Sequence, residues 1–147
     1  MRFLRRILIT AMILPALHTA AAQSRFASTS ATAPSEQQGY DVFNPIAKYI
    51  RQGDAEKLSA WFADNLEISI FSSSNASSRN QARQILKSFF DTYTPRSFDI
   101  THTAGRANMK YALGSLNAGG EALEVTIFVT NKGNSYKIQL LKIDRTD

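Results

Sequence analysis

Apolar residues recur with a helical period in the first third of the folded region. This pattern predicts one helix over residues 41–52 and a second over residues 55–63. Gly53 and Asp54 lie between them, where glycine commonly ends a helix and aspartate commonly caps the next one. We therefore expect two short consecutive helices joined by a tight turn.

A third helix is predicted over residues 78–93. Ser78 and Gln81 have the spacing of a capping box, in which each side chain bonds a backbone N–H at the start of the helix. The start of the first helix is less well defined. Either Asp41 or the pair Asn44–Pro45 fits there, and the pattern leaves both open.

The remaining periodic segments alternate between apolar and polar residues, which is typical of strands with one buried face. Short glycine-containing turns at residues 118–120 and 131–134 predict two hairpins, and the Ser/Asn-rich residues 72–77 predict a loop. The expected fold is α+β in the order α-α-β-α-β-β-β-β, with three helices packed on one side of a curved antiparallel sheet. The expected strands cover residues 66–70, 97–103, 109–117, 121–130 and 135–144.

Several stretches of this region resemble the domain of unknown function 4783 family, and the resemblance covers residues 40–144. The resemblance implies a small exported bacterial protein, typical of Bacteroidetes, with the cystatin-like α+β fold of the nuclear-transport-factor-2-like superfamily. It implies a sheet curved into a cone that three helices close around a pocket, and it implies no activity. The stretches that carry it are residues 46–48, 53–62, 84–90, 97–102, 111–116 and 136–143.

The N-terminus has the pattern of an export signal. Arg2, Arg5 and Arg6 precede an apolar run at residues 7–17, and small residues follow up to Ala22. This run is much shorter than the roughly 20 apolar residues that span a bilayer. We expect cleavage after Ala22, no transmembrane anchor afterwards, and a destination in the periplasm or outside the cell.

The expected organisation is a signal peptide at residues 1–22, a flexible leader at 23–39 and a domain at 40–147. The whole chain has 17 basic and 12 acidic residues, but three of the arginines lie in the signal. The rest has a net charge of only +2 on the same counting, which does not indicate nucleic-acid binding.

Few residues could carry chemistry. The chain has no cysteine, and His102 is the only histidine after the signal, so we expect no metal and no cofactor. Alternation places His102 on one strand face with Phe98 and Ile100, directed into the cone. It could act there with Tyr111 as an acid/base pair, or it could be a structural core residue.

We expect no carboxylate on the apolar face of a strand, and Asp99 alternates away from it. We therefore predict a non-catalytic domain that binds a small apolar or amphipathic ligand. The alternative is a ketosteroid-isomerase-like or hydratase-like enzyme that uses His102 and Tyr111. The candidate pocket-lining residues are Tyr49, Trp61, Phe89, Tyr93, Phe98, His102 and Tyr111.

The last two strands carry apolar residues in both alternation phases. Phe128, Leu141 and Ile143 fall on the face that should be polar, which predicts a sheet-mediated homodimer or protein-interaction module. A β-bulge at Leu140–Leu141 that reverses the phase is the alternative explanation.

Overall fold

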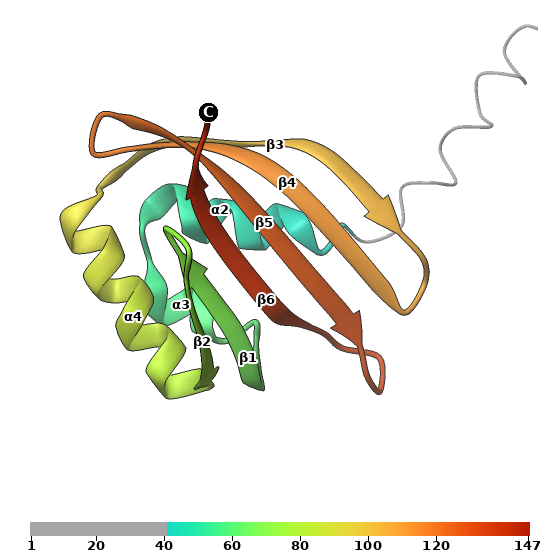
Figure 1. Ribbon diagram of the computed structural model, residues 1–147. Coiled ribbons are helices and arrows are strands. Elements are labelled where there is room, and N and C mark those ends of the chain that lie inside the picture. Colours follow the sequence, from blue (N-terminus) through green and yellow to red (C-terminus); the bar gives the residue numbers. More distant parts are fainter. Residues whose placement is uncertain (1–40) are drawn as a thin grey trace, which may run out of the picture. The chain divides into compact units, whose positions relative to one another are not determined.

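The computed structural model describes residues 41–147, and the predicted signal peptide (residues 1–22) and leader (residues 23–39) lie outside them. Three helices and six strands form the α+β fold (Figure 1). The helices are α2 (Phe43–Gln52), α3 (Ala55–Ser59) and α4 (Arg79–Thr92). The strands are β1 (Phe62–Ile70), β2 (Ser73–Ser78), β3 (Pro95–Gly105), β4 (Met109–Ala118), β5 (Glu121–Asn131) and β6 (Tyr136–Arg145).

The helix boundaries follow the capping residues. Gly53 ends α2 in the left-handed conformation, and the Asp54 side chain accepts a hydrogen bond from the Lys57 N–H at the start of α3. Ser78 and Gln81 form the predicted capping box of α4. The first helix begins at Phe43, with Val42 at the N-cap position and no side-chain cap. None of the described helices has the length and apolarity to cross a membrane.

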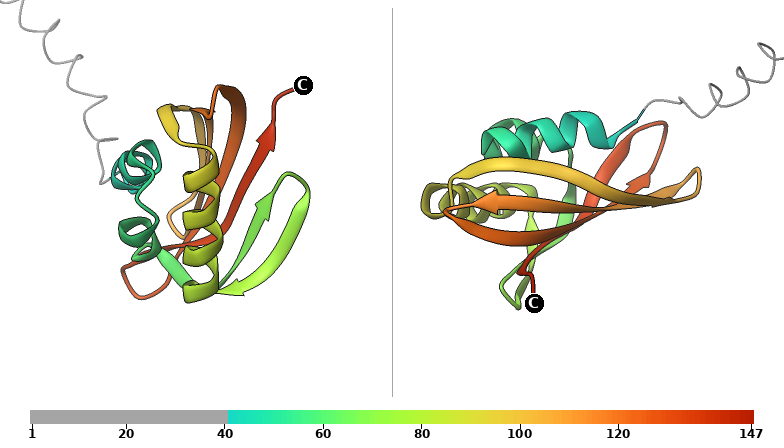
Figure 2. Two further views of the ribbon diagram at one scale, coloured as in Figure 1. Left: turned by 90° about the vertical axis from the view of Figure 1, so that its left-hand side faces the viewer. Right: turned by 90° about the horizontal axis from the view of Figure 1, so that it is seen from above.

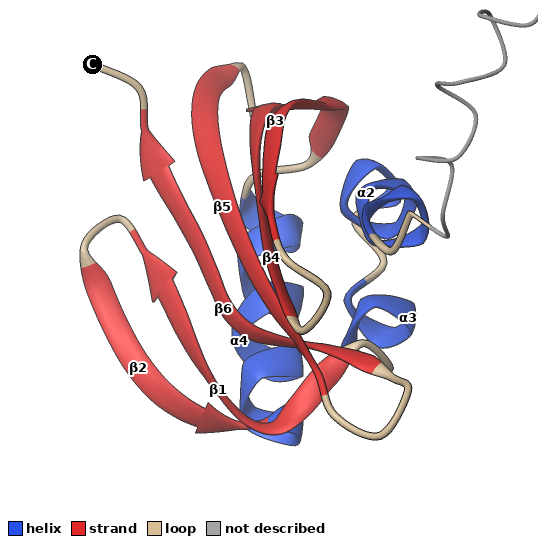
Figure 3. Ribbon diagram, turned by 90° about the vertical axis from the view of Figure 1, so that its right-hand side faces the viewer, coloured by secondary structure: helices blue, strands red, loops and turns tan. Residues whose placement is uncertain are grey.

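The strand order in the sheet is β2-β1-β6-β5-β4-β3 (Figure 3). Neighbouring strands are antiparallel except β1 and β6, which run parallel. The predicted curved antiparallel sheet is therefore confirmed in every pair except this one. Parallel neighbours need a long connection, and here α4 with β2 to β5 lies between β1 and β6 in the sequence.

Two segments differ from the predicted elements. The second predicted helix extends to residue 63, but α3 ends at Ser59 and β1 begins at Phe62. The helix stops early because this segment pairs with β6, where the Ile138 N–H donates a hydrogen bond to the Trp61 carbonyl at 2.7 Å. Residues 72–77 were expected to form a loop. They instead supply most of β2, which pairs with β1 from Ser73 to Ser78.

All three helices lie on one side of the curved sheet (Figure 2). The core fills the space between the two layers, and the Phe98 and Leu116 side chains, paired across the edge strand β3 and its neighbour β4, are fully buried in it. Arg51 of α2 holds this region by donating from Nη2 to the Phe98 carbonyl at 2.8 Å. The layer between α2 and the sheet is thus packed with side chains.

Two irregularities in strand pairing reverse the alternation of side chains. In β3 the register shifts between Ile100 and His102, and in β6 it shifts opposite Phe128 and Val129. One extra residue in a strand turns every later side chain to the other face. Sequence alternation therefore assigns the wrong face beyond each shift.

Candidate functional site

A cleft opens on the helix side of the sheet, between α4 and the hairpin of β1 and β2. Its volume is about 350 Å³, within the range of small-ligand sites. Inward-facing side chains of both strands form one wall, and one face of α4 forms the other. The lining residues are Ile68, Ile70, Phe71, Ser73, Asn75, Ile85, Ser88, Phe89, Thr92 and Tyr93.

Aromatic rings form the inner end of this cleft. Phe89 of α4 and Tyr93 at the C-cap of this helix stack with their ring centroids 5.0 Å apart. The Phe71 ring meets the Tyr93 ring edge-on at 5.3 Å, and the Arg145 guanidinium lies 4.0 Å from the centroid of Phe71. Such contacts add to the stability of the packed rings, so this wall is fixed before any ligand arrives.

The turn of the β1–β2 hairpin holds Phe71 in an unfavourable backbone conformation. Phe71 and Ser72 have φ values of 50° and 71°, and glycine or asparagine is the usual residue at such positions. A left-handed conformation costs a residue with a bulky side chain on the order of 1–2 kcal/mol. The aromatic contacts and the hydrogen bond from the Phe71 N–H to the Ile143 carbonyl hold the turn in place.

Uncharged polar groups form the rim of the cleft. Ser73 and Asn75 project from β2, and Ser88 and Thr92 project from α4. The ten lining residues include no aspartate, glutamate, lysine, arginine or histidine. Among residues 41–147, the buried polar residues are three serines. Glu121 shares the inner face of β5 with Leu123 and its Oε2 atom is buried, so the expectation that no carboxylate lies on the apolar face of a strand is wrong there, although Glu121 does not line the cleft. The cleft can provide apolar contact and neutral hydrogen bonds.

Of the predicted pocket residues, Phe89 and Tyr93 line this cleft. Phe98 is fully buried in the core instead. Tyr49 and Trp61 are partly buried against the same core and do not line the cleft. The cleft therefore lies at one edge of the sheet, between α4 and the β1–β2 hairpin, and not at the centre of the cone where the pocket is predicted.

His102 and Tyr111 lie near each other, but on the opposite face of the sheet. Their ring centroids are 6.0 Å apart, and Tyr111 is 37% exposed. The register shift after Ile100 turns His102 away from Phe98, so the expectation that His102 points into the cone is wrong. Tyr111, paired with Phe128, is likewise on the outer face.

The residues predicted to form a dimer face lie on two different faces of the sheet. Leu141 and Ile143 are 1% exposed and lie in the core with Ile138, because the extra residue in β6 reverses the phase. Their expected place on the outer face is therefore wrong, and the β-bulge explains their pattern. Phe128 is on the outer face and is half-buried there, opposite Leu140.

The hairpin half of the cleft does not follow from the sequence pattern. Ile68 and Ile70 lie on the predicted strand, but the partner of that strand, β2, occupies residues for which the pattern predicts a loop. The sequence did contain one indication of a hairpin: only two residues separate the end of the alternating run from a polar stretch that is long enough to pair with it. Phe71 itself gave no signal, because phenylalanine is unusual in such a turn.

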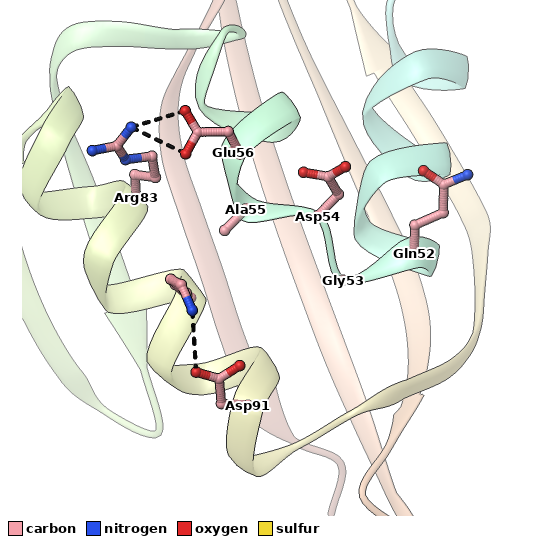
Figure 4. Close-up of a pocket in the computed structure, with 8 residues that line it drawn as sticks. Gln52, Gly53, Asp54, Ala55, Glu56, Arg83 and Asp91 are labelled. Carbon is pink, nitrogen blue, oxygen red and sulfur yellow. Dashed lines mark hydrogen bonds and ion pairs between the residues drawn. The ribbon is translucent and has the colours of Figure 1, made fainter.

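A second groove, of about 340 Å³, lies where α2 and α3 meet α4, and Figure 4 shows its charged side chains. These charges neutralise one another. Arg83 donates to both Glu56 carboxylate oxygens, at 2.9 and 3.1 Å, and Lys87 pairs with Asp91 at 3.6 Å. Asp54 is used as the α3 cap. These pairs make the groove a poorer ligand site than the apolar cleft. No group of three or more potential metal ligands occurs in residues 41–147.

Comparisons with known proteins agree with this fold. A family model described as domain of unknown function (DUF4783) matches residues 43–144. A DUF4783 family protein from Bacteroides uniformis is 22% identical, with a TM-score of 0.70 over 73% of this chain and 99% of that chain. A comparison with curated proteins found no match.

More distant structures share the fold alone. One is the protein named Rd1NTF2_04 with long sheet, which is 18% identical with a TM-score of 0.54 over 66% of this chain and 91% of that chain. Another is a domain of unknown function with a cystatin-like fold from Nostoc punctiforme. It is 14% identical, with a TM-score of 0.57 over 82% of this chain and 78% of that chain.

Proposed function

The chain belongs to the family described as domain of unknown function (DUF4783), and from that premise we propose that it is a non-catalytic binding domain. Its ligand is a small apolar or amphipathic group that enters the cleft between α4 and the β1–β2 hairpin. The observation that carries this proposal is the lining of that cleft: apolar and aromatic walls, a neutral polar rim and no charged side chain.

The fixed geometry of the cleft supports the same proposal. The Phe71 ring of the hairpin turn contacts both the Phe89 and the Tyr93 rings, so the two walls are joined at this end of the cleft without a ligand. Backbone strain is commonly retained at functional sites when the surrounding structure fixes it. A site formed in advance loses less conformational entropy when it binds.

The absence of histidine, carboxylate and lysine side chains from the lining of the cleft argues against the enzyme alternative. An isomerase or hydratase needs a proton donor or acceptor within hydrogen-bond reach of the substrate. His102 and Tyr111, the predicted pair, face away from the cleft on the outer side of the sheet. Tyr93 is the one titratable side chain that lines the cleft.

A fluorescent probe tests the proposal. N-phenyl-1-naphthylamine becomes fluorescent in apolar surroundings, and we expect saturable binding to the purified chain. Ile85→Glu introduces a carboxylate into the cleft and should weaken binding at least about tenfold, because the carboxylate would be desolvated. Leu113→Glu is the matched control, since Leu113 is equally half-buried but lies on the outer face of the sheet.

The control should bind the probe as the natural chain does. Equal binding by the Ile85→Glu variant would place the probe elsewhere and refute the proposal, as would no binding by the natural chain to this probe or to a short-chain fatty acid.

We also propose that the chain is exported and cleaved after Ala22. The support is the basic, apolar and small-residue order of residues 2–22 in the sequence.

Homodimerisation through the outer sheet face is a second candidate function. Met109 and Tyr111 are 49% and 37% exposed, and Phe128 and Leu140 continue this apolar area across β5 and β6. Sedimentation velocity tests it: Phe128→Lys should convert a dimer to a monomer. A natural chain that is already monomeric at high concentration would refute it.

A further inference from the structure

The two edge strands of the sheet differ in their protection against pairing. At one edge, β3 carries Pro95, the charged Arg96 and Asp99, and two register shifts. Proline, charge and bulges are the features that keep an exposed strand from pairing with another chain. At the other edge, the six residues of β2 (Ser73–Ser78) include no charge and no proline, and they pair with β1 in unbroken register.

The geometry of the hairpin shows which groups β2 presents at this edge. A two-residue turn makes the flanking residues Ile70 and Ser73 a hydrogen-bonded pair, and the pairs then alternate along the hairpin. Ser74 and Ala76 therefore direct their backbone N–H and C=O groups away from β1. Residues 73 to 76 are exposed, so among residues 41–147 no element covers this edge.

The open edge and the cleft adjoin each other. The side chains of Ser73 and Asn75 line the cleft, while the backbone between them is the free edge. Figure 2 shows the β1–β2 hairpin beside α4, with β2 as the outermost strand. A strand added to β2 would run along the mouth of the cleft, and every second side chain of that strand would face α4.

We propose that the ligand of the cleft is an extended peptide, which pairs with β2 as a seventh strand and places an aliphatic or aromatic side chain in the cleft. This inference rests on the proposed function and names its ligand class. The repeating N–H and C=O groups of Ser74 and Ala76 match an extended backbone, and the cleft provides the side-chain specificity that strand addition itself lacks.

The composition of β2 makes a second copy of this chain a poor occupant. If two β2 strands paired, the incoming strand would offer the cleft only serine, asparagine and alanine side chains. None of these fills a cleft lined by Ile70, Phe89 and Tyr93. The occupant must combine a free extended backbone with a large apolar side chain, and residues of the partner that face the neutral rim should be uncharged.

Short labelled peptides provide the test. The probe is a fluorescein-labelled hexapeptide that alternates threonine with phenylalanine and ends in two added lysines for solubility, measured by fluorescence polarisation with the full chain. We expect saturable binding, at least about tenfold weaker when serine replaces each phenylalanine. Two further peptides carry N-methyl groups on the threonines or on the phenylalanines. One of these sets must face β2, so at least one peptide should bind about tenfold more weakly.

Two variants of one residue separate strand pairing from simple apolar binding. Ala76→Pro removes an outward N–H that β1 does not use, and Ala76→Thr keeps it. The proline variant should lose peptide binding about tenfold while the threonine variant retains it, and both should still bind N-phenyl-1-naphthylamine. Loss of the naphthylamine signal in the proline variant would indicate a damaged fold, and the N-methylated peptides then decide on the natural chain.

Three results would overturn the inference. Equal binding of both N-methylated peptides and the parent peptide would show that no backbone pairing occurs, and the proposed function would survive if the naphthylamine still binds. Peptide binding that Ile85→Glu leaves unchanged would place the peptide outside the cleft. A dimer that Ala76→Pro converts to a monomer would assign the edge to a second copy.

Discussion

Substitution of Gly114 by alanine tests whether the space inside the sheet at β3 and β4 is filled. A Cβ atom at Gly114 would lie 2.4 Å from Cζ and 2.5 Å from Cε1 of Phe98, whereas carbon atoms in contact normally stay about 3.5–4.0 Å apart. The Phe98 ring is fully buried, and Leu116 opposite it is fully buried as well. The ring therefore has no free space into which it can move.

The expected cost follows from two opposing effects. Overpacking a filled core costs about 1–3 kcal/mol, while alanine in place of glycine restricts the unfolded chain and contributes about 0.4–1 kcal/mol of stability. The clash is the larger effect, so Gly114→Ala should lower the free energy of unfolding by roughly 1–2 kcal/mol. For a domain of this size that corresponds to a fall in Tm on the order of 5–10 °C.

Urea unfolding followed by circular dichroism measures this change. Phe98→Leu removes the ring atoms that clash, so the double variant should lose less stability than the sum of the two single variants, by about 1 kcal/mol. Ser115→Ala, at the exposed neighbouring position, is the control and should change stability by less than about 0.5 kcal/mol. A Gly114→Ala chain as stable as the natural one would show that Phe98 does not fill this space, and the central pocket would have to be reconsidered.

Three other predictions concern separate features. Ser78→Ala removes the α4 capping box and should cost about 1 kcal/mol in urea unfolding; no loss would mean that the cap is not formed in solution. His102→Ala and Tyr111→Phe, on the outer face, should leave N-phenyl-1-naphthylamine binding within about twofold of the natural value, and a tenfold loss would contradict the assignment of the cleft. Mass spectrometry of the exported protein should find Gln23 at its N-terminus, whereas an intact Met1 would exclude cleavage.

Local rules in the sequence predicted the helices well. The Ser78–Gln81 capping box, the left-handed Gly53 and the Asp54 cap are short-range features, and all three are present. The two glycine-containing hairpin turns were predicted for the same reason. The α+β class followed from these elements and their order.

The features that the sequence did not reveal depend on long-range pairing. An extra residue in a strand leaves no pattern of its own, so the register shifts in β3 and β6 placed His102 and Leu141 on the wrong faces. The polar β2 has little strand propensity, and it forms because β1 is beside it and the turn at Phe71 is held by tertiary contacts. The hairpin wall of the cleft could therefore not be predicted, because residues of β2 have the sequence pattern of a loop.

The alternation of apolar and polar residues in the sequence therefore assigns side chains to the correct face only up to the point where a strand contains a register shift. In this chain, His102 in β3 and Leu141 and Ile143 in β6 lie beyond a shift and changed their assignment, whereas Phe89 on α4 and Tyr93 at its C-cap kept theirs.

Methyl NMR of the isoleucines tests the location of the binding site most directly. Ile68, Ile70 and Ile85 line the cleft, and Ile46 and Ile127 are fully buried elsewhere in the core. Titration with N-phenyl-1-naphthylamine should shift the methyl signals of the first three and leave the other two nearly unchanged. Shifts confined to Ile46 and Ile127, or no saturable shift in any of the five, would contradict the account.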